Sequence, residues 1–383
     1  MATFLRTTEI AVAGARTLPG EYFKSPSILA QERERIFAAR WLCVGREARV
    51  AEPGDYFLQP VGDDSVIVLR DQGGELRAFY NVCRHRGTRL CTAASGRFAE
   101  TIQCPYHAWT WKLDGRLVGA PSADEIDGFC KADYPLRRVA VASWEGFLFL
   151  NLSQDPVPFA EEFAAVQGRF TRFNLAALQV ARRVDYDVRA NWKLIVQNYS
   201  ECYHCAPVHP ALARVSPPTS GENDLFEGPV LGGFMTINDG SDSLTMSGRA
   251  CGVPVGDLGE EDRRRVYYYA LFPNTLLSLH PDYVMYHTLW PQEPGRTLVT
   301  CEWLFHPGTL ADPTFDVDDG VGFWDMTNRQ DWEVCELSQL GVVSRGYEPG
   351  PYSRRESLAV AFDREVLKTL GRGGAPDGAD RRD

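Results

Sequence analysis

The sequence has no long apolar run and no cluster of basic residues. Its longest mostly apolar stretches, such as GFLFLNL at 146–152, are too short to cross a bilayer, and the start MATFLRTTEI lacks the hydrophobic region of a signal peptide. The formal net charge is -11, which argues against nucleic-acid binding, because contacts with phosphates need a basic surface. We therefore expect a cytoplasmic protein that acts on a small molecule, with no membrane and no nucleic acid as partner.

Two further absences restrict its redox chemistry. The sequence contains neither a G-x-G-x-x-G dinucleotide fingerprint nor the cysteine run of plant-type ferredoxins, so we do not expect it to take electrons from NAD(P)H unaided. It has ten cysteines, but a disulfide framework is not expected in a cytoplasmic chain. Most of the cysteines should be buried thiols, and any that cluster should bind metal or take part in catalysis.

The length favours two globular lobes. At 383 residues, with 44% hydrophobic residues, the chain exceeds the size at which single cores usually stop growing. We predict an α+β protein with an N-terminal segment and helix at 1–42, a small all-β domain at 43–150, a mixed α/β domain at 151–370 and a disordered tail at 371–383.

The spacing of apolar residues supports this division. A helix is predicted at 27–41, just after Pro26, and a hairpin turn at DQGG, residues 71–74. Strands are predicted at 55–61, 65–71, 75–82, 179–191, 266–272 and 282–290, and further helices at 192–204 and 323–341.

Two Cys/His pairs lie between predicted strands of the small domain. Cys83-x-His85 and Cys104-x-x-His107 are separated by eighteen residues, and the whole chain has only seven histidines. Two thiolates and two imidazoles can bind zinc or form a Rieske [2Fe-2S] cluster. Each pair supplies one cysteine and one histidine, which suits a cluster whose two irons have different ligands better than a zinc site or a set of unrelated buried residues.

A second group of metal-binding residues lies in NYSECYHCAPVH at 198–209. On a helix, Glu201 and His204 would share a face, and His209 lies beyond the break at Pro207. Two histidines and a carboxylate form the facial triad that leaves positions open on Fe(II). Taken alone, a pair of histidines five residues apart is as consistent with a structural role.

The fragments CRHRG and CPYHAW resemble the Rieske motif of the oxygenase components of Rieske non-heme iron oxygenases, also called aromatic ring-hydroxylating oxygenases. The resemblance covers most of the chain. It implies a Rieske domain at 43–150 and, at 151–370, a catalytic mononuclear iron domain with an antiparallel sheet flanked by helices. Electrons would come from NAD(P)H through a separate flavin/iron-sulfur reductase.

The resemblance also implies the remaining iron ligand and a bridging acid. The family pattern D-x-x-x-x-E-x-x-Q-x-G is similar to DWEVCELSQLG here, which makes Asp331 the third ligand, with Asp325 as the alternative. Family members use an acid three residues before the first iron histidine as a bridge between subunits. By that match, Glu201 links His204 to the Rieske histidine His107 of a neighbouring subunit in a homotrimer.

The substrate is the open question. Glutamate at position 201 resembles the branch that acts on quaternary ammonium compounds such as glycine betaine and carnitine, whereas most aromatic-ring oxygenases have aspartate there. This implies an oxygenase that uses O2 for oxidative N-demethylation; hydroxylation or dihydroxylation of an aromatic ring is the alternative, and a Rieske electron carrier or a zinc-stabilised binding module are hypotheses of other classes. Aromatic residues on predicted strands are candidates for a cation-binding pocket: Tyr267, Tyr269, Tyr283, Tyr286 and Trp290.

Overall fold

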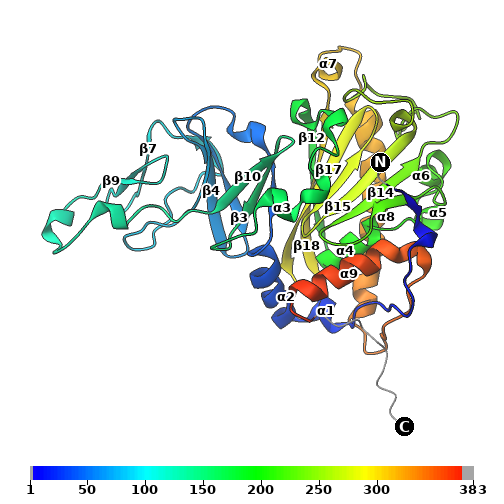
Figure 1. The fold of residues 1–383 in the computed structure, drawn as a ribbon, viewed down its shortest axis with the longest axis horizontal. Coiled ribbons are helices and arrows are strands. Elements are labelled where there is room, and N and C mark those ends of the chain that lie inside the picture. The colour runs from blue at the N-terminus through cyan, green and yellow to red at the C-terminus, as the bar shows by residue number, and fades with distance from the viewer. Residues whose placement is uncertain (1–2, 373–383) are drawn as a thin grey trace, which may run out of the picture. The chain divides into compact units, whose positions relative to one another are not determined.

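The computed structural model describes residues 3–372, and the chain forms two compact units (Figure 1). The smaller unit is Phe37–Val157, where the sequence predicts a domain at 43–150, and the larger unit combines the chain before it with the chain from Pro158 onward. Within 3–372, no helix is both long enough and apolar enough to span a membrane. Most of the predicted tail lies outside the described residues, but Gly371 and Arg372 bond back to the last turn of α9 (Ser357–Thr369).

The smaller unit consists of short antiparallel strands in three sheets. Their orders are β5-β4-β3-β6, β7-β8-β9 and β10-β11-β2. The predicted turn closes the β4–β5 hairpin, where Asp71 Oδ1 accepts the backbone N–H groups of Gly73 and Glu75. The strands are β2 (Leu42–Arg46), β3 (Asp55–Val61), β4 (Asp64–Arg70), β5 (Leu76–Tyr80), β6 (Ser95–Arg97), β7 (Thr101–Gln103), β8 (Thr110–Lys112), β9 (Leu117–Gly119), β10 (Ala140–Trp144) and β11 (Phe147–Asn151).

The larger unit is built on an eight-stranded sheet whose strand pairs are antiparallel, in the order β1-β13-β14-β15-β16-β17-β18-β12. Its long C-terminal strands alternate buried side chains toward both faces, as expected for a sheet covered by helices. The strands are β1 (Leu5–Arg6), β12 (Gln179–Val188), β13 (Glu222–Leu225), β14 (Val230–Thr236), β15 (Arg265–Leu271), β16 (Thr275–Leu279), β17 (Tyr283–Glu293) and β18 (Arg296–Phe305).

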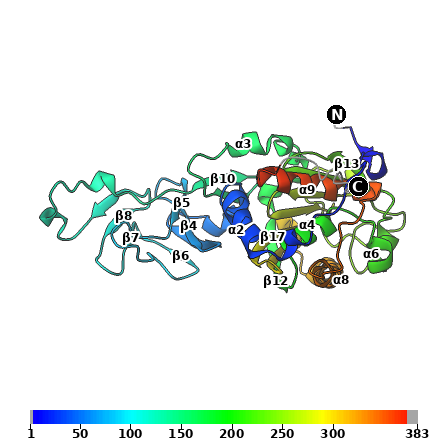
Figure 2. The ribbon, with the colours of Figure 1, turned by 90° about the horizontal axis from the view of Figure 1, so that it is seen from below.

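Two long helices, α8 and α9, accompany this sheet, and Figure 2 looks nearly along α8. Short helices precede them. The helices are α1 (Glu21–Lys24), α2 (Pro26–Glu32), a π-helical turn (Arg33–Phe37), α3 (Phe159–Glu162), α4 (Trp192–Tyr199), α5 (Cys205–Val208), α6 (Pro210–Val215), α7 (Pro307–Leu310), α8 (Val317–Val342) and α9.

The start of α4 is fastened to α8. The side chain of Asn191 caps α4 by accepting the Lys193 N–H, and the Asn191 N–H donates to Gln339 Oε1 on α8 at 2.9 Å. One helical turn earlier on α8, Glu336 Oε1 accepts the Arg189 N–H at 2.9 Å. Two residues of the family-like pattern therefore fix α4 relative to α8, which sets where the chain after α4 meets Asp331.

The predicted helix 192–204 is too long, because α4 ends at Tyr199. After Ser200 the chain turns, and the Glu201 carboxylate accepts the backbone N–H groups of Tyr203 and His204. A carboxylate that bonds to nearby N–H groups competes with the helical pattern, which explains the early end. Glu201 and His204 therefore meet through a turn rather than along one face of a helix.

Candidate functional site

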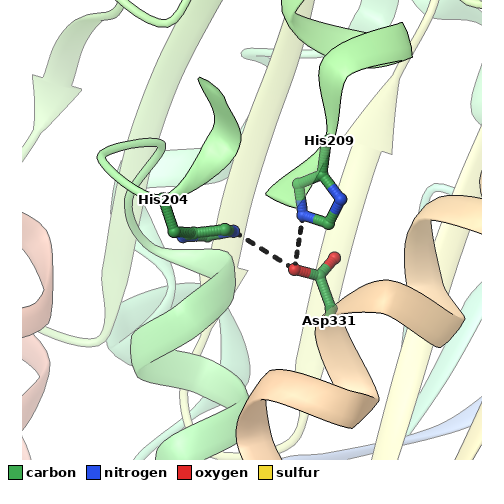
Figure 3. Close-up of side chains that lie close together, drawn as sticks. All are labelled: His204, His209 and Asp331. Carbon is green, nitrogen blue, oxygen red and sulfur yellow. Dashed lines mark hydrogen bonds and ion pairs between the residues drawn. The ribbon is translucent and has the colours of Figure 1, made fainter. Parts of the chain in front are cut away.

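His204, His209 and Asp331 come together in the larger unit (Figure 3). One potential ligand atom from each lies within 4.8 Å of the others. His204 Nε2 is 3.2 Å from Asp331 Oδ1, and His209 Nε2 is 2.8 Å from the same oxygen. His204 precedes α5, His209 joins α5 to α6, where Pro210 starts a new helix, and Asp331 projects from α8.

The outer nitrogen of each imidazole is held by a side chain. His204 Nδ1 lies 2.6 Å from Glu201 Oε1, and His209 Nδ1 lies 2.8 Å from Gln330 Oε1. With Nδ1 donating to these acceptors, Nε2 of both rings is left to face Asp331. Histidines that bind metals are oriented in this way, through a hydrogen bond from the other ring nitrogen.

The geometry fits a divalent ion. Ligand bonds of about 2.1 Å at right angles place neighbouring donor atoms about 3 Å apart, close to the two N···O separations of His204 and His209 with Asp331. Two imidazoles and a carboxylate are the donor set of the non-heme Fe(II) facial triad. All three residues also line the cavity described below, so an ion that they held would be accessible from it.

The charges around this group are unusual. Burial alone would lower the pKa of His204, but hydrogen bonds to Asp331 and Glu201 outweigh it and raise that pKa to about 10. Burial would likewise raise the pKa of Asp331, but the bonds from His204 and His209 hold it below its ordinary value. The two carboxylates therefore favour positive charge at this site, which a bound metal ion would supply in place of the proton on His204.

The alternative carboxylate, Asp325, does not reach this group. Its Oδ1 accepts the Tyr186 O–H at 2.7 Å, and its Oδ2 accepts from Arg329 at 2.9 Å. Asp325 lies six residues before Asp331 on α8, where its side chain faces β12 instead. The structure thus favours Asp331 over Asp325.

A cavity of about 270 Å³ adjoins the three residues. Glycines on β14 form part of its wall, and a side chain at Gly232 would collide with the Tyr268 carbonyl oxygen, so this position requires glycine. The aromatic residues that line the cavity are Tyr199, Tyr203, Phe234, Tyr268 and Trp324.

None of the five aromatic residues expected from the sequence lines this cavity. Side chains alternate along a strand, so Tyr268 faces the cavity while its neighbours Tyr267 and Tyr269 face the opposite side of the sheet. There the Tyr267 O–H donates to Asp262 and the Tyr269 O–H donates to Asp224. The prediction chose the wrong face of β15.

The other three expected residues are also engaged elsewhere. The Tyr283 O–H donates to the Leu244 carbonyl, the Tyr286 O–H donates to Glu302, and the Trp290 indole donates to Thr288. Tyr283 and Tyr286 are fully buried in the sheet core. Aromatic residues on β17 therefore serve packing.

The two Cys/His pairs come together in the smaller unit. Cys83 and Cys104 are 3% and 2% exposed, whereas His85 is exposed and its ring centroid lies 4.7 Å from that of His107. The backbone N–H groups of His85 and Arg86 point at the Cys83 sulfur. Hydrogen bonds to sulfur and inward cysteines with outward histidines fit a [2Fe-2S] cluster of the Rieske type.

One cysteine pair departs from the expectation. Cys202 and Cys205 form a disulfide, with their Cα atoms 4.9 Å apart, so the prediction that clustered cysteines bind metal or act in catalysis is wrong for them. The turn held by Glu201 brings the two side chains together on either side of His204. Of the other described cysteines, Cys43, Cys301 and Cys335 are buried thiols, Cys83 and Cys104 belong to the buried pair described above, and Cys91, Cys130 and Cys251 are partly or fully exposed.

Comparisons with known proteins match both units. Residues 40–137 match the Rieske [2Fe-2S] domain, and residues 175–372 match the ring hydroxylating alpha subunit (catalytic domain). The glycine betaine monooxygenase oxygenase subunit of Chromohalobacter salexigens is 32% identical over 91% of this chain and 84% of its own length. The carnitine monooxygenase oxygenase subunit of Escherichia coli is 33% identical over 87% of this chain and 86% of its own length.

A solved structure shows the same architecture. The quaternary ammonium Rieske monooxygenase CntA, in complex with L-carnitine, aligns with a TM-score of 0.74 and 25% identity over 94% of this chain and 96% of that chain. The chain belongs to the ring-hydroxylating oxygenase α-subunit family, and is an iron-dependent oxidoreductase with a Rieske domain and a catalytic domain. The predicted oxygenase class and α+β fold are confirmed, and a plain electron carrier and a zinc module are excluded.

Several residues of the site were not expected from the sequence. Gln330 and Asn198 contact the two histidines, with Asn198 Nδ2 lying 3.3 Å from His204 Nε2. Nothing in the sequence marks them. Tyr268, by contrast, stands in the run VYYYALF, and the strand alternation would have found it had the inner face been known.

Proposed function

We propose that this oxygenase hydroxylates an N-methyl group of a quaternary ammonium compound of the glycine betaine or carnitine type. The carbinolamine product then collapses to formaldehyde and a demethylated amine. The observation that carries this proposal is the aromatic cavity beside the three proposed metal-binding residues. Aromatic faces attract quaternary ammonium ions. The named activities of its relatives support the same substrate class.

Different residues of the cavity would hold the iron, orient its ligands and bind the substrate. We propose that His204, His209 and Asp331 hold the mononuclear iron and that Glu201 and Gln330 orient the two imidazoles. When bound, Fe(II) and the cluster supply dioxygen activation and electrons. The aromatic wall would keep water from the ammonium group and direct a methyl group toward His204, His209 and Asp331.

The cluster ligands are proposed as Cys83, His85, Cys104 and His107. Because His85 is exposed and His107 is half-buried beside it, an electron can leave near the surface of this unit. We propose that it passes through Glu201 to His204 from His107 of the partner subunit in a homotrimer. We also propose that a separate reductase supplies the electrons and that the protein is cytoplasmic.

The bridge has a direct test in Glu201→Gln. The amide keeps the shape but loses the charge that orients the imidazoles, so both iron centres should stay loaded while electron transfer fails. Chemically reduced protein is mixed with substrate and oxygen, and cluster oxidation is followed by absorbance in a single turnover. Wild-type oxidation with full product yield would exclude the bridge, and loss of mononuclear iron would make Glu201 a ligand.

The substrate class is tested with iron-loaded protein, a generic reductase and NAD(P)H. Glycine betaine, carnitine and aromatic acids are screened for formaldehyde and for hydroxylated rings. Formaldehyde with a quaternary ammonium compound is the expected result. Phenol or cis-diol formation from an aromatic acid, without formaldehyde from any ammonium compound, would contradict the proposal.

A further inference from the structure

The cavity beside the metal-binding residues has a basic side as well as an aromatic one. Its lining includes two arginines, Arg6 and Arg355, in addition to the aromatic residues and His204. Near His204 the lining is acidic, through Glu201 and Asp331. The cavity therefore has negative groups among and beside the proposed iron ligands and positive groups elsewhere on its wall.

The two arginines come from segments far apart in the sequence. Arg6 ends β1, which pairs with β13 at the edge of the large sheet, and Arg355 lies in the 3-10 turn just before α9. A hydrogen bond of 3.3 Å from Ser357 Oγ to the Thr7 carbonyl joins the two segments. Folding thus brings both guanidinium groups to one cavity.

Both arginines are exposed, and Glu9 accepts the backbone N–H of Arg6 rather than pairing with its guanidinium. Within residues 3–372, no carboxylate lies within ion-pair distance of the Arg6 or Arg355 side chain. Arg355 is placed over the ring of Tyr203, with 5.9 Å from its guanidinium carbon to the ring centroid. Tyr203 itself lines the cavity, so the Arg355 charge lies beside one of the aromatic rings of its wall.

A quaternary ammonium ion alone gives no reason for this arrangement. Its positive charge is repelled by a guanidinium, whereas a carboxylate is bound by one in a bidentate, charge-assisted manner. A zwitterion with a trimethylammonium group at one end and a carboxylate at the other matches the aromatic and acidic side together with the arginines. A choline-like alcohol matches the aromatic and acidic side but has no carboxylate for the arginines to bind.

We propose that Arg355, assisted by Arg6, binds the carboxylate of a betaine substrate and thereby selects betaines over quaternary ammonium alcohols. This inference rests on the proposed function, since it assigns the second charged end of the same substrate class. Arg355 is a specificity-determining residue in this scheme. Its role is to bind substrate and not to take part in the chemical step.

The test compares R355Q with wild type on glycine betaine, carnitine and choline. Loss of a charge-assisted contact should raise KM and the Kd for both betaines about 30- to 100-fold, with kcat within about twofold. Values for choline should stay within about twofold, so the preference for betaines falls by the same factor. Formaldehyde release gives kcat and KM, and calorimetric titration gives Kd without turnover.

Three variants control for indirect effects. R354Q removes the adjacent charge, which does not line this cavity, and should change no constant by more than about twofold. R355K keeps a point charge and should recover part of the lost affinity. R6Q should weaken betaine binding less than R355Q, and thermal melts show whether each variant folds.

The outcomes separate the two proposals. Unchanged betaine KM in R355Q, or an equal rise for betaines and choline, would overturn the role of Arg355 while leaving the proposed function intact. Wild-type turnover of choline with no preference for betaines would do the same. If the wild type released formaldehyde from neither class, the proposed function would fail, and this inference with it.

Discussion

The aromatic wall makes a quantitative prediction through Tyr268. Its ring lies 6.1 Å from that of Tyr199 and 6.2 Å from that of Trp324, and all three line the cavity. Burial raises the pKa of Tyr268 well above its ordinary value, so the phenol stays protonated and uncharged. Tyr268→Leu keeps an apolar side chain at this position but removes the aromatic face.

The size of the effect follows from the loss of one cation–π contact. A desolvated contact contributes about 2 kcal/mol, and about 1.4 kcal/mol corresponds to a tenfold change in an equilibrium constant. We therefore expect KM and Kd for the ammonium substrate to rise about 30-fold in Tyr268→Leu. Tyr268→Phe retains the ring and should stay within about threefold of wild type.

The assay is steady-state formaldehyde release, which separates kcat from KM, with calorimetric Kd as a second reading. Tyr269→Phe is the matched control, because this neighbour faces the other side of β15 and loses only its bond to Asp224. That variant should lose about 1 kcal/mol of unfolding free energy and keep its KM. An unchanged KM in Tyr268→Leu, or an equal rise in Tyr269→Phe, would refute the assignment of the cavity wall.

Three further predictions address the metals and a buried acid. Cys83→Ser should abolish the visible [2Fe-2S] absorbance, and a full cluster spectrum in this variant would reject the ligand assignment. Asp331→Ala should lower iron from about three to about two per chain while the cluster spectrum survives. If Asp325→Ala caused this loss and Asp331→Ala did not, Asp325 would be the ligand and the assignment of Asp331 would be wrong. Burial raises the pKa of Asp363 to about 7 against hydrogen bonds that lower it, so its contribution to stability is complete below about pH 4 and is lost as pH rises through about 7. Asp363→Asn should remove a few kcal/mol of that pH dependence in denaturant melts, and parallel curves for the two proteins would contradict it.

Most of the proposed metal-binding residues could be predicted from the sequence because their spacing is local. Cys83-x-His85 and Cys104-x-x-His107 need only short loops between strands, and His209 lies close to His204 along the chain. The distant Asp331 was reached through resemblance to a family, since no local rule connects residues more than a hundred positions apart. The structure brings it to within 3.2 Å of His204, because the start of α4 is tied to α8.

Local pattern was less successful where the outcome depended on which side of an element faces the interior. Helical periodicity extended the helix to residue 204, but the Glu201 carboxylate captures backbone N–H groups and ends it at Tyr199. Strand alternation identified the aromatic run on β15, yet alternation has two phases, and the cavity lies beside the phase that contains Tyr268.

The sequence alone indicated the two-domain α+β organisation and the cysteines and histidines of the proposed iron-sulfur site, because these depend on residue type and short spacing, whereas the class of chemistry followed from resemblance to a family. Only the tertiary structure decided which aromatic rings form the cavity, that Gln330 holds His209, and that Arg6 and Arg355 share a wall. Such features depend on the meeting of segments that lie far apart in the sequence, such as those of Gln330 and His209, which are 121 residues apart. The physical reason is that packing of α8, α9 and the sheet edge, rather than any local preference, fixes those distances.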